Sequence, residues 1–172
     1  MDRDDEIIAT WTELLTTDGE TPPPPLVARC AATFGPAPDY VLCQAIHDHG
    51  TRWKVAVLTA NLFGCAEARS AHPHWDSQAY VNQLGHDDGA TYDCWAGSVR
   101  EVVRVSTLPH EDDGQHWRAV SAEQGTAILS SWRIELRDEH HVDLPFGELP
   151  TDLAAHERAD EIAISLLKSL AL

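Results

Sequence analysis

The chain has 172 residues, which is long enough for one domain with a hydrophobic core and too short for two ordinary ones. Its 12 lysine and arginine residues stand against 28 aspartate and glutamate residues, giving a formal net charge of -16. Phosphate backbones and anionic lipid surfaces would repel such a chain, so we expect neither nucleic acid nor a membrane as its partner. The acidic residues are scattered along the sequence, which is typical of a solvated surface that keeps a protein soluble.

The N-terminal sequence MDRDDEIIAT lacks the basic start, the apolar segment and the small-residue cleavage site of a secretory signal. No run approaches the ~18 to 20 apolar residues that a membrane-spanning helix needs. We therefore expect a soluble cytoplasmic protein, in which the four cysteines remain thiols and do not form disulfides.

Two helices are predicted in the first part of the chain. Apolar residues recur at helical spacing over residues 4–16, and acidic residues occupy the first turn, where the helix dipole favours negative charge. The proline run in DGETPPPP, residues 18–25, ends this helix, and its last proline can open a second helix over residues 26–34. Leu26, Cys30 and Phe34 share one face of the second helix, which predicts a core thiol at Cys30.

We expect residues 1–36 to form a helical extension that covers an open sheet face or edge of its own domain. This segment carries more apolar surface than one short helical pair can hide within itself. The alternative is a homodimer that forms through the same surface.

The next residues have the composition of antiparallel strands, because β-branched and apolar residues dominate them. HDHGT, residues 47–51, has the aspartate and glycine of a hairpin turn. Residues 70–93 form a long polar stretch, which predicts a functional or mobile loop. Strands are predicted, in chain order, at residues 39–49, 52–61, 62–69 and 98–108, with a further short one through Trp117 in 115–124.

The clearest alternation lies near the end of the chain, where a β-hairpin is predicted. The apolar face of its first strand consists of Ile128, Trp132, Ile134 and Leu136, and the polar face of Arg133, Glu135 and Arg137. The pattern resumes at Val142 and Leu144 after a polar turn. Residues 151–170 predict an amphipathic helix with an apolar stripe formed by Ala159, Ile162, Ala163, Leu166, Leu167 and Leu170.

The predicted fold class is α+β: two N-terminal helices precede a six- or seven-stranded antiparallel curved sheet or barrel, which a C-terminal amphipathic helix caps. Three segments carry a resemblance to a known family. They are the hairpin at Tyr40 to Phe63, the run SWRIELRDEHHVDLP at residues 131–145, and ERADEIAISLLKSL at residues 157–170, into which that run leads. This element order resembles the pleckstrin-homology-like (PH-like) barrel. The resemblance covers residues 38–172.

The chain length predicts a single compact unit, and the resemblance implies a PH-like domain at residues 37–172 behind the helical extension at 1–36. Lipid-binding members of this family carry a basic cluster in the first hairpin loop. Here HDHGTRWK offers Arg52 and Lys54 beside Asp48, so phosphoinositide binding is not expected.

Histidines near two turns form a candidate metal site. In CQAIHDH, Cys43 and His49 lie about 20 Å apart on an extended strand, too far to share a zinc ion whose ligands lie ~2.0 to 2.3 Å away. The candidate ligands are two pairs, His47 with His49 and His72 with His74. The alternative is that Cys43 is a core thiol and the histidines are loop residues, since no CxxC or HExxH spacing is present.

Two tryptophans are candidate contact residues for a protein partner. Trp75 lies in the polar stretch HPHWD, where an exposed indole is favoured at contact surfaces. Trp11 lies in the helical extension, on a face that is also predicted to pack.

Every strong pattern in the chain explains packing, and none explains chemistry. We therefore expect a non-catalytic protein-binding or scaffolding module, with a protein partner or a homodimer and no cofactor. The alternative is a small metal-dependent hydrolase that binds zinc through His47, His49, His72 and His74. Asp76 or Asp48 would then be its base.

Overall fold

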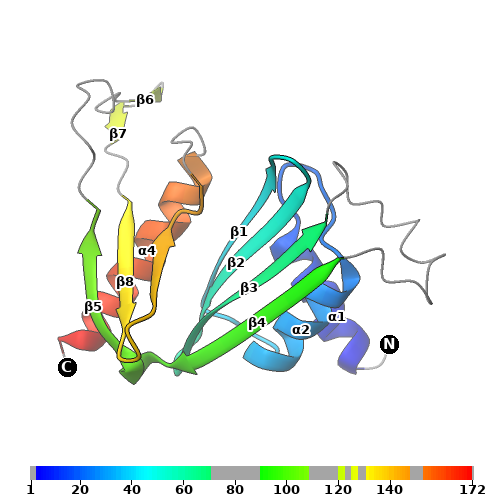
Figure 1. Ribbon diagram of the computed structural model, residues 1–172, viewed down its shortest axis with the longest axis horizontal. Coiled ribbons are helices and arrows are strands. Elements are labelled where there is room, and N and C mark those ends of the chain that lie inside the picture. Colours follow the sequence, from blue (N-terminus) through cyan, green and yellow to red (C-terminus); the bar gives the residue numbers. More distant parts are fainter. Residues whose placement is uncertain are drawn as a thin grey trace. The chain divides into compact units, whose positions relative to one another are not determined.

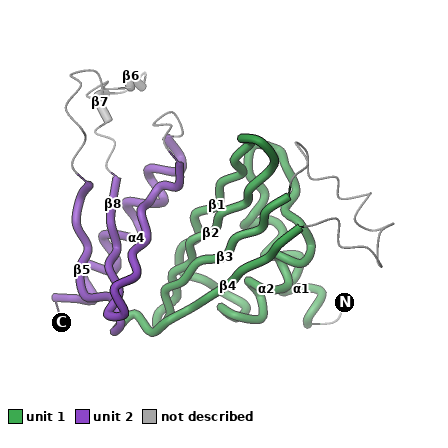
Figure 2. The backbone as a smooth tube through the Cα atoms, viewed as in Figure 1, with its two compact units in different colours: residues 1–99 green, residues 100–172 purple. Residues whose placement is uncertain are grey.

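The computed structural model describes residues 3–70, 90–108, 120–122, 125–127, 131–147 and 153–171. The chain divides into two compact units, Met1–Val99 and Arg100–Leu172 (Figure 2). Each unit has its own sheet and its own helical cover.

Unit 1 is a four-stranded antiparallel sheet with two helices on one face (Figure 1). The strands follow one another in space as they do in sequence, in the order β1-β2-β3-β4. Every neighbouring pair is antiparallel and in continuous register over eight residue pairs. The elements are α1 (Arg3–Leu15), α2 (Pro24–Phe34), β1 (Tyr40–His47), β2 (Thr51–Leu58), β3 (Leu62–Ser70) and β4 (Thr91–Ser98).

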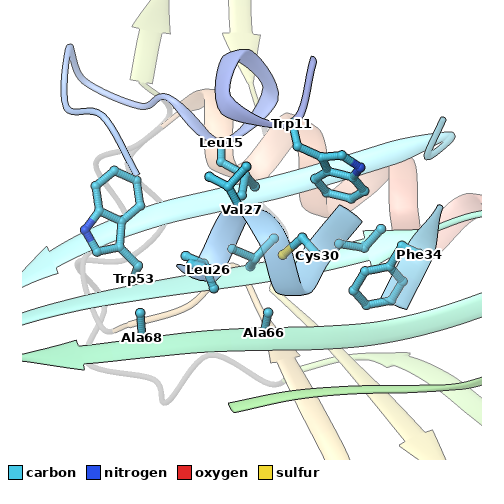
Figure 3. Packing of buried hydrophobic residues seen from close by; sticks show 11 residues of the cluster. Trp11, Leu15, Leu26, Val27, Cys30, Phe34, Trp53, Ala66 and Ala68 are labelled. Carbon is cyan, nitrogen blue, oxygen red and sulfur yellow. The ribbon is translucent and has the colours of Figure 1, made fainter. Parts of the chain in front are cut away.

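The core of unit 1 lies between this sheet and its two helices (Figure 3). The helices contribute Trp11, Leu15, Leu26, Val27, Cys30 and Phe34, and the strands contribute Trp53, Val55, Val57, Ala66 and Ala68. The N-terminal helices therefore cover a sheet face of their own domain, as the sequence predicts. They share one core with the first four strands, whereas the sequence predicted an extension distinct from a domain that starts at residue 37.

Polar contacts fix both helices on the sheet. The indole Nε1 of Trp11 donates to the carbonyl oxygen of Gly35 over 2.8 Å. On β1, the thiol of Cys43 donates to the carbonyl oxygen of Leu15 over 3.3 Å, at the last residue of α1. On β4, the thiol of Cys94 lies 3.3 Å from Oγ1 of Thr33 in α2.

Unit 2 contains a three-stranded antiparallel sheet in the order β5-β8-β9, a two-stranded ladder of β6 and β7, and one long helix. The side chains of Ile134, Leu136 and Leu144 are buried, as are those along one stripe of the helix. Trp132 is half-buried, and its Nε1 donates to Oδ1 of Asp160 over 2.6 Å. The elements are β5 (Val102–Thr107), β6 (Val120–Ala122), β7 (Gly125–Ala127), β8 (Trp132–Leu136), β9 (His141–Leu144) and α4 (Leu153–Leu170), with a 3-10 turn, η1, at Val99–Glu101.

The α+β class, the two N-terminal helices, both predicted hairpins and the C-terminal helix are confirmed. The strands that the structure describes do not close into the expected barrel: they form separate sheets, and β5 pairs with β8 and not with β4. The resemblance to the PH-like family gains no support from these sheets and stays a prediction. The sequence also missed β4, part of which lay in the predicted loop at residues 70–93.

Candidate functional site

The four cysteines are free thiols, and their surroundings hold the pKa of each one above its ordinary value. Burial raises the pKa of Cys30 and of Cys65 to about 12, and it also raises the pKa of Cys43 and of Cys94. The thiolate is the nucleophile and the metal ligand, so a raised pKa disfavours both roles for these thiols. The expectation that Cys30 is a core thiol is confirmed, because this residue is fully buried.

His47 ends β1 and contacts two side chains of its own unit. Its Nε2 lies 2.7 Å from Oε1 of Glu20, in the connection between α1 and α2. Its Nδ1 lies 3.4 Å from Oγ1 of Thr51, at the start of β2. The order hydroxyl, imidazole, carboxylate is that of a nucleophilic triad, but Thr51 is fully buried and the contact is long. This arrangement joins the hairpin to the helical connection, and the hydroxyl of Thr51 within it is buried.

The four-histidine metal site is only partly within the described residues. His49 lies in the turn after β1, in the left-handed region at φ 53°. His72, His74 and Asp76 lie outside the described residues. Among the residues that the structure describes, no group of three or more His, Cys, Asp or Glu side chains could hold a metal ion. The site with all four histidines stays a prediction, and the hydrolase alternative has no supporting geometry in the described residues.

Of the two tryptophans predicted to contact a partner, the structure describes one. Trp11 is 0% exposed, its ring centroid is 6.2 Å from that of Phe34, and its indole N–H is bonded to a backbone carbonyl. Packing within unit 1 therefore occupies this side chain, which is not on a contact surface. The reason is that the apolar stripe of α1 faces the sheet. Trp75 lies outside the described residues.

The outermost strands of the sheets provide a different kind of candidate site. An outermost strand presents backbone N–H and C=O groups to which another extended segment can add. Proteins usually block such edges with charges, prolines, bulges or short strands. The outermost strands of the four- and three-stranded sheets are β1, β4, β5 and β9.

Three of these four strands carry a blocking feature. The register of β5 shifts between Val102 and Arg104. The strand β9 has only four residues and is followed by Pro145. The strand β4 carries an exposed carboxylate at Asp93 and lacks a side chain at Gly97.

The strand β1, with the sequence YVLCQAIH, carries no such feature. It is eight residues long and has no proline, no glycine, no acidic residue, no lysine and no arginine. Its pairing with β2 is regular along its whole length, and six of its side chains are partly exposed. Among the described residues, no strand pairs with the edge of β1 that faces away from β2 (Figure 1).

Alternate side chains of β1 lie on two different surfaces. Val41, Cys43 and Ala45 pack against the core that the helices cover. Tyr40, Leu42, Gln44 and Ile46 lie on the opposite face, because successive side chains of a strand alternate. A segment added to β1 would therefore continue both the packed layer beneath α1 and the opposite surface of the sheet.

Carboxylates lie at both ends of β1. Asp39 precedes the strand and is exposed. At the other end, Glu20 contacts His47, and Asp48 pairs with Arg52. Among the described side chains, the two ends hold three carboxylates and one arginine, so more acidic than basic groups lie there.

Comparisons with known proteins do not assign the chain to a family. No protein-family model, curated protein or solved structure matches it. Among the helices that the structure describes, none is long and apolar enough to cross a membrane.

Proposed function

We propose that the chain is a non-catalytic protein-binding module and that it takes an extended segment of its partner along the outer edge of β1. The observation that carries this proposal is the regular, uncharged and proline-free strand at the edge of the sheet of unit 1. Main-chain hydrogen bonds would supply the affinity of such a complex, and the alternate side chains would supply its specificity.

The polar groups of unit 1 that could perform chemistry favour the same proposal. The thiols have raised pKa values, and His47 contacts Glu20 and Thr51. These contacts join the helices and the hairpin to the sheet, which stabilises the strand that would receive the partner. A rigid edge favours binding because less conformational entropy is lost when the complex forms.

Site-specific photo-crosslinking in the source cells tests the proposal. A photo-reactive residue replaces Gln44 on β1 or, as the matched control, Asp93 on β4, the other outermost strand of the same sheet. We expect one discrete crosslinked protein from position 44 and none from position 93. Once that protein is identified and purified, mixing it with the position-44 variant should give the same crosslinked product. Equal crosslinking from both strands, or none from β1, would contradict the proposal.

Metal analysis of the purified protein tests the hydrolase alternative. Stoichiometric zinc or manganese that is lost in the His72→Ala and His74→Ala variants would overturn the non-catalytic assignment. A protein without bound metal after purification in metal-containing buffer would agree with it.

A further inference from the structure

The edge of β1 also indicates the chemistry of its partner, if the proposed function is correct. We propose that the partner segment is an extended stretch of another protein, about eight residues long, with lysine or arginine at both ends and small or apolar residues between them. Three features of unit 1 carry this inference: the charges at the two ends of the strand, the composition between them, and the acidic charge that a second copy would add.

The charges at the two ends favour a segment with cationic ends. Asp39 lies before the first residue of β1, and Asp48 and Glu20 lie beside its last residue. Asp48 is nine positions after Asp39, so an extended strand places them about 30 Å apart. A partner strand of about eight residues would put its two terminal side chains beside these carboxylates. The net charge of -16 adds a long-range attraction for a basic segment.

The residues between the two ends are uncharged, which selects against charge in the middle of the partner. The partner would lie directly beside Val41, Ala45 and Ile46, which are partly exposed at this edge. A lysine or glutamate opposite them would lose solvation without gaining an ion pair, whereas valine or threonine would pack. On the helix side, α1 contacts β1 and lies beside α2, so one flank of α1 borders the same edge.

A second copy of the chain fits this edge less well than a basic segment. A second copy would bring its own Asp39, Asp48 and Glu20 to the same edge, so most of the charges that it adds would be like charges. Each copy also carries a net charge of -16, and this repulsion opposes association at low ionic strength.

Three synthetic nine-residue peptides test the inference with the full chain. Each peptide alternates valine and threonine, and the residue at both ends is lysine in the first, glutamine in the second and glutamate in the third. Fluorescence anisotropy gives the dissociation constants, and hydrogen exchange shows which amides become protected. We expect the lysine peptide to bind about tenfold more tightly than the glutamate peptide, with protection of the amides of β1 and not of β4.

Two N-methylated versions of the lysine peptide separate strand addition from simple charge attraction. One version is methylated at odd positions and the other at even positions, so each loses the N–H groups along one edge only. Strand addition predicts that one version binds and the other does not. Binding of both versions, or of neither, would overturn the pairing that we propose.

Two protein variants with the same change in net charge test the role of Asp39. We expect Asp39→Lys to weaken binding of the lysine peptide about fivefold, and Asp93→Lys on β4 to leave it unchanged.

Equal binding of all three peptides, with the amides of β1 protected, would overturn the basic partner but keep the protein-binding function. Binding of no peptide, or protection elsewhere, would overturn both. A dimer with protected β1 amides in the absence of peptide would identify the partner as a second copy and overturn the inference.

Discussion

The ring of Phe34 lies directly on Gly64. A Cβ atom built on Gly64 would lie 3.0 Å from Cε1 of Phe34 and 2.7 Å from Cα of Ala96, and it would also clash with the carbonyl oxygen of Trp95. The glycine is therefore required for space: it lets α2 approach β3 while β4 pairs closely on the other side. In this way a single position without a side chain sets the distance between the helical layer and the sheet.

We expect Gly64→Ala to destabilise the protein by about 1–3 kcal/mol, because the added methyl group meets backbone atoms that cannot move without shifting β4. The matched control is Gly97→Ala on β4, where an added Cβ would have no atom within 4 Å. Chemical denaturation of both variants measures the difference. Equal stability of the two variants would show that the close contact between α2 and β3 does not exist in solution.

The orientation of β8 gives a second prediction. Leu136 is 7% exposed, whereas its neighbour Arg137 is exposed and lies 3.7 Å from a carboxylate oxygen of Glu101. Leu136→Asp would bury an unpaired charge, and we expect it to cost about 3 kcal/mol or more. Arg137→Ala removes one solvent-screened ion pair, so its melting temperature should stay close to that of the wild type. Loss of stability in the arginine variant alone would reverse the assignment of the two faces.

The thiols give a third prediction, which concerns reactivity. Since burial raises the pKa of Cys30 and Cys65 to about 12, only about one molecule in ten thousand carries either thiolate at pH 8. We expect negligible modification of these two cysteines by a disulfide reagent in the folded protein and rapid modification of all four in guanidinium. Mass spectrometry after timed labelling at pH 8 identifies the sites. Rapid labelling of Cys30 without denaturant would show that α2 leaves the sheet frequently.

A fourth prediction concerns pH and the turn between β8 and β9. Nδ1 of His140 lies 2.9 Å from Oδ2 of Asp138, and this hydrogen bond raises the pKa of His140 and lowers that of Asp138. NMR titration should therefore give His140 a pKa above 6.5, and Asp138→Asn should return it to that value. A pKa unchanged by the substitution would contradict the pair.

The pair of His140 and Asp138 also makes the stability of the turn depend on pH. The contribution of His140 is fully present below its unfolded pKa and is lost as the pH rises through the folded pKa. The contribution of Asp138 is present above its unfolded pKa and is lost as the pH falls through the folded pKa. The pair therefore stabilises the turn mainly between about pH 4 and 6.5, and weakly, because solvent screens it.

Local pattern predicted most elements of the fold, and its failures have physical causes. The strand β4 was missed because TYDCWAGS is polar and contains small residues, although Tyr92 and Cys94 alternate toward the core of unit 1.

The helix α4 is 18 residues and about 27 Å long, whereas β8 has five residues and spans about 17 Å. The helix therefore extends past the sheet, which leaves Leu167 and Leu170 38% and 42% exposed at the end of the predicted apolar stripe.

The candidate site was harder to predict from the sequence than the fold. The composition of YVLCQAIH predicts a strand, but nothing local shows that this strand is the outermost one. That position depends on which strands pair, and pairing depends on contacts between distant residues. Trp11 illustrates the same limit: its type suggested a contact surface, but the packing of α1 on the sheet put it in the core.

The division of the chain has a consequence for its synthesis on the ribosome. Every residue of the core cluster of unit 1 lies before Val99, so this core can form while the rest of the sequence is still being translated. Unit 2 differs, because the helix that packs against β5 and β8 is the last element of the sequence. A ribosome that stalled before Leu153 would leave the apolar side of β8 without its cover. Such an unfinished product would keep the core of unit 1 but expose an apolar sheet face of unit 2. Chaperones and proteases recognise surfaces of this kind.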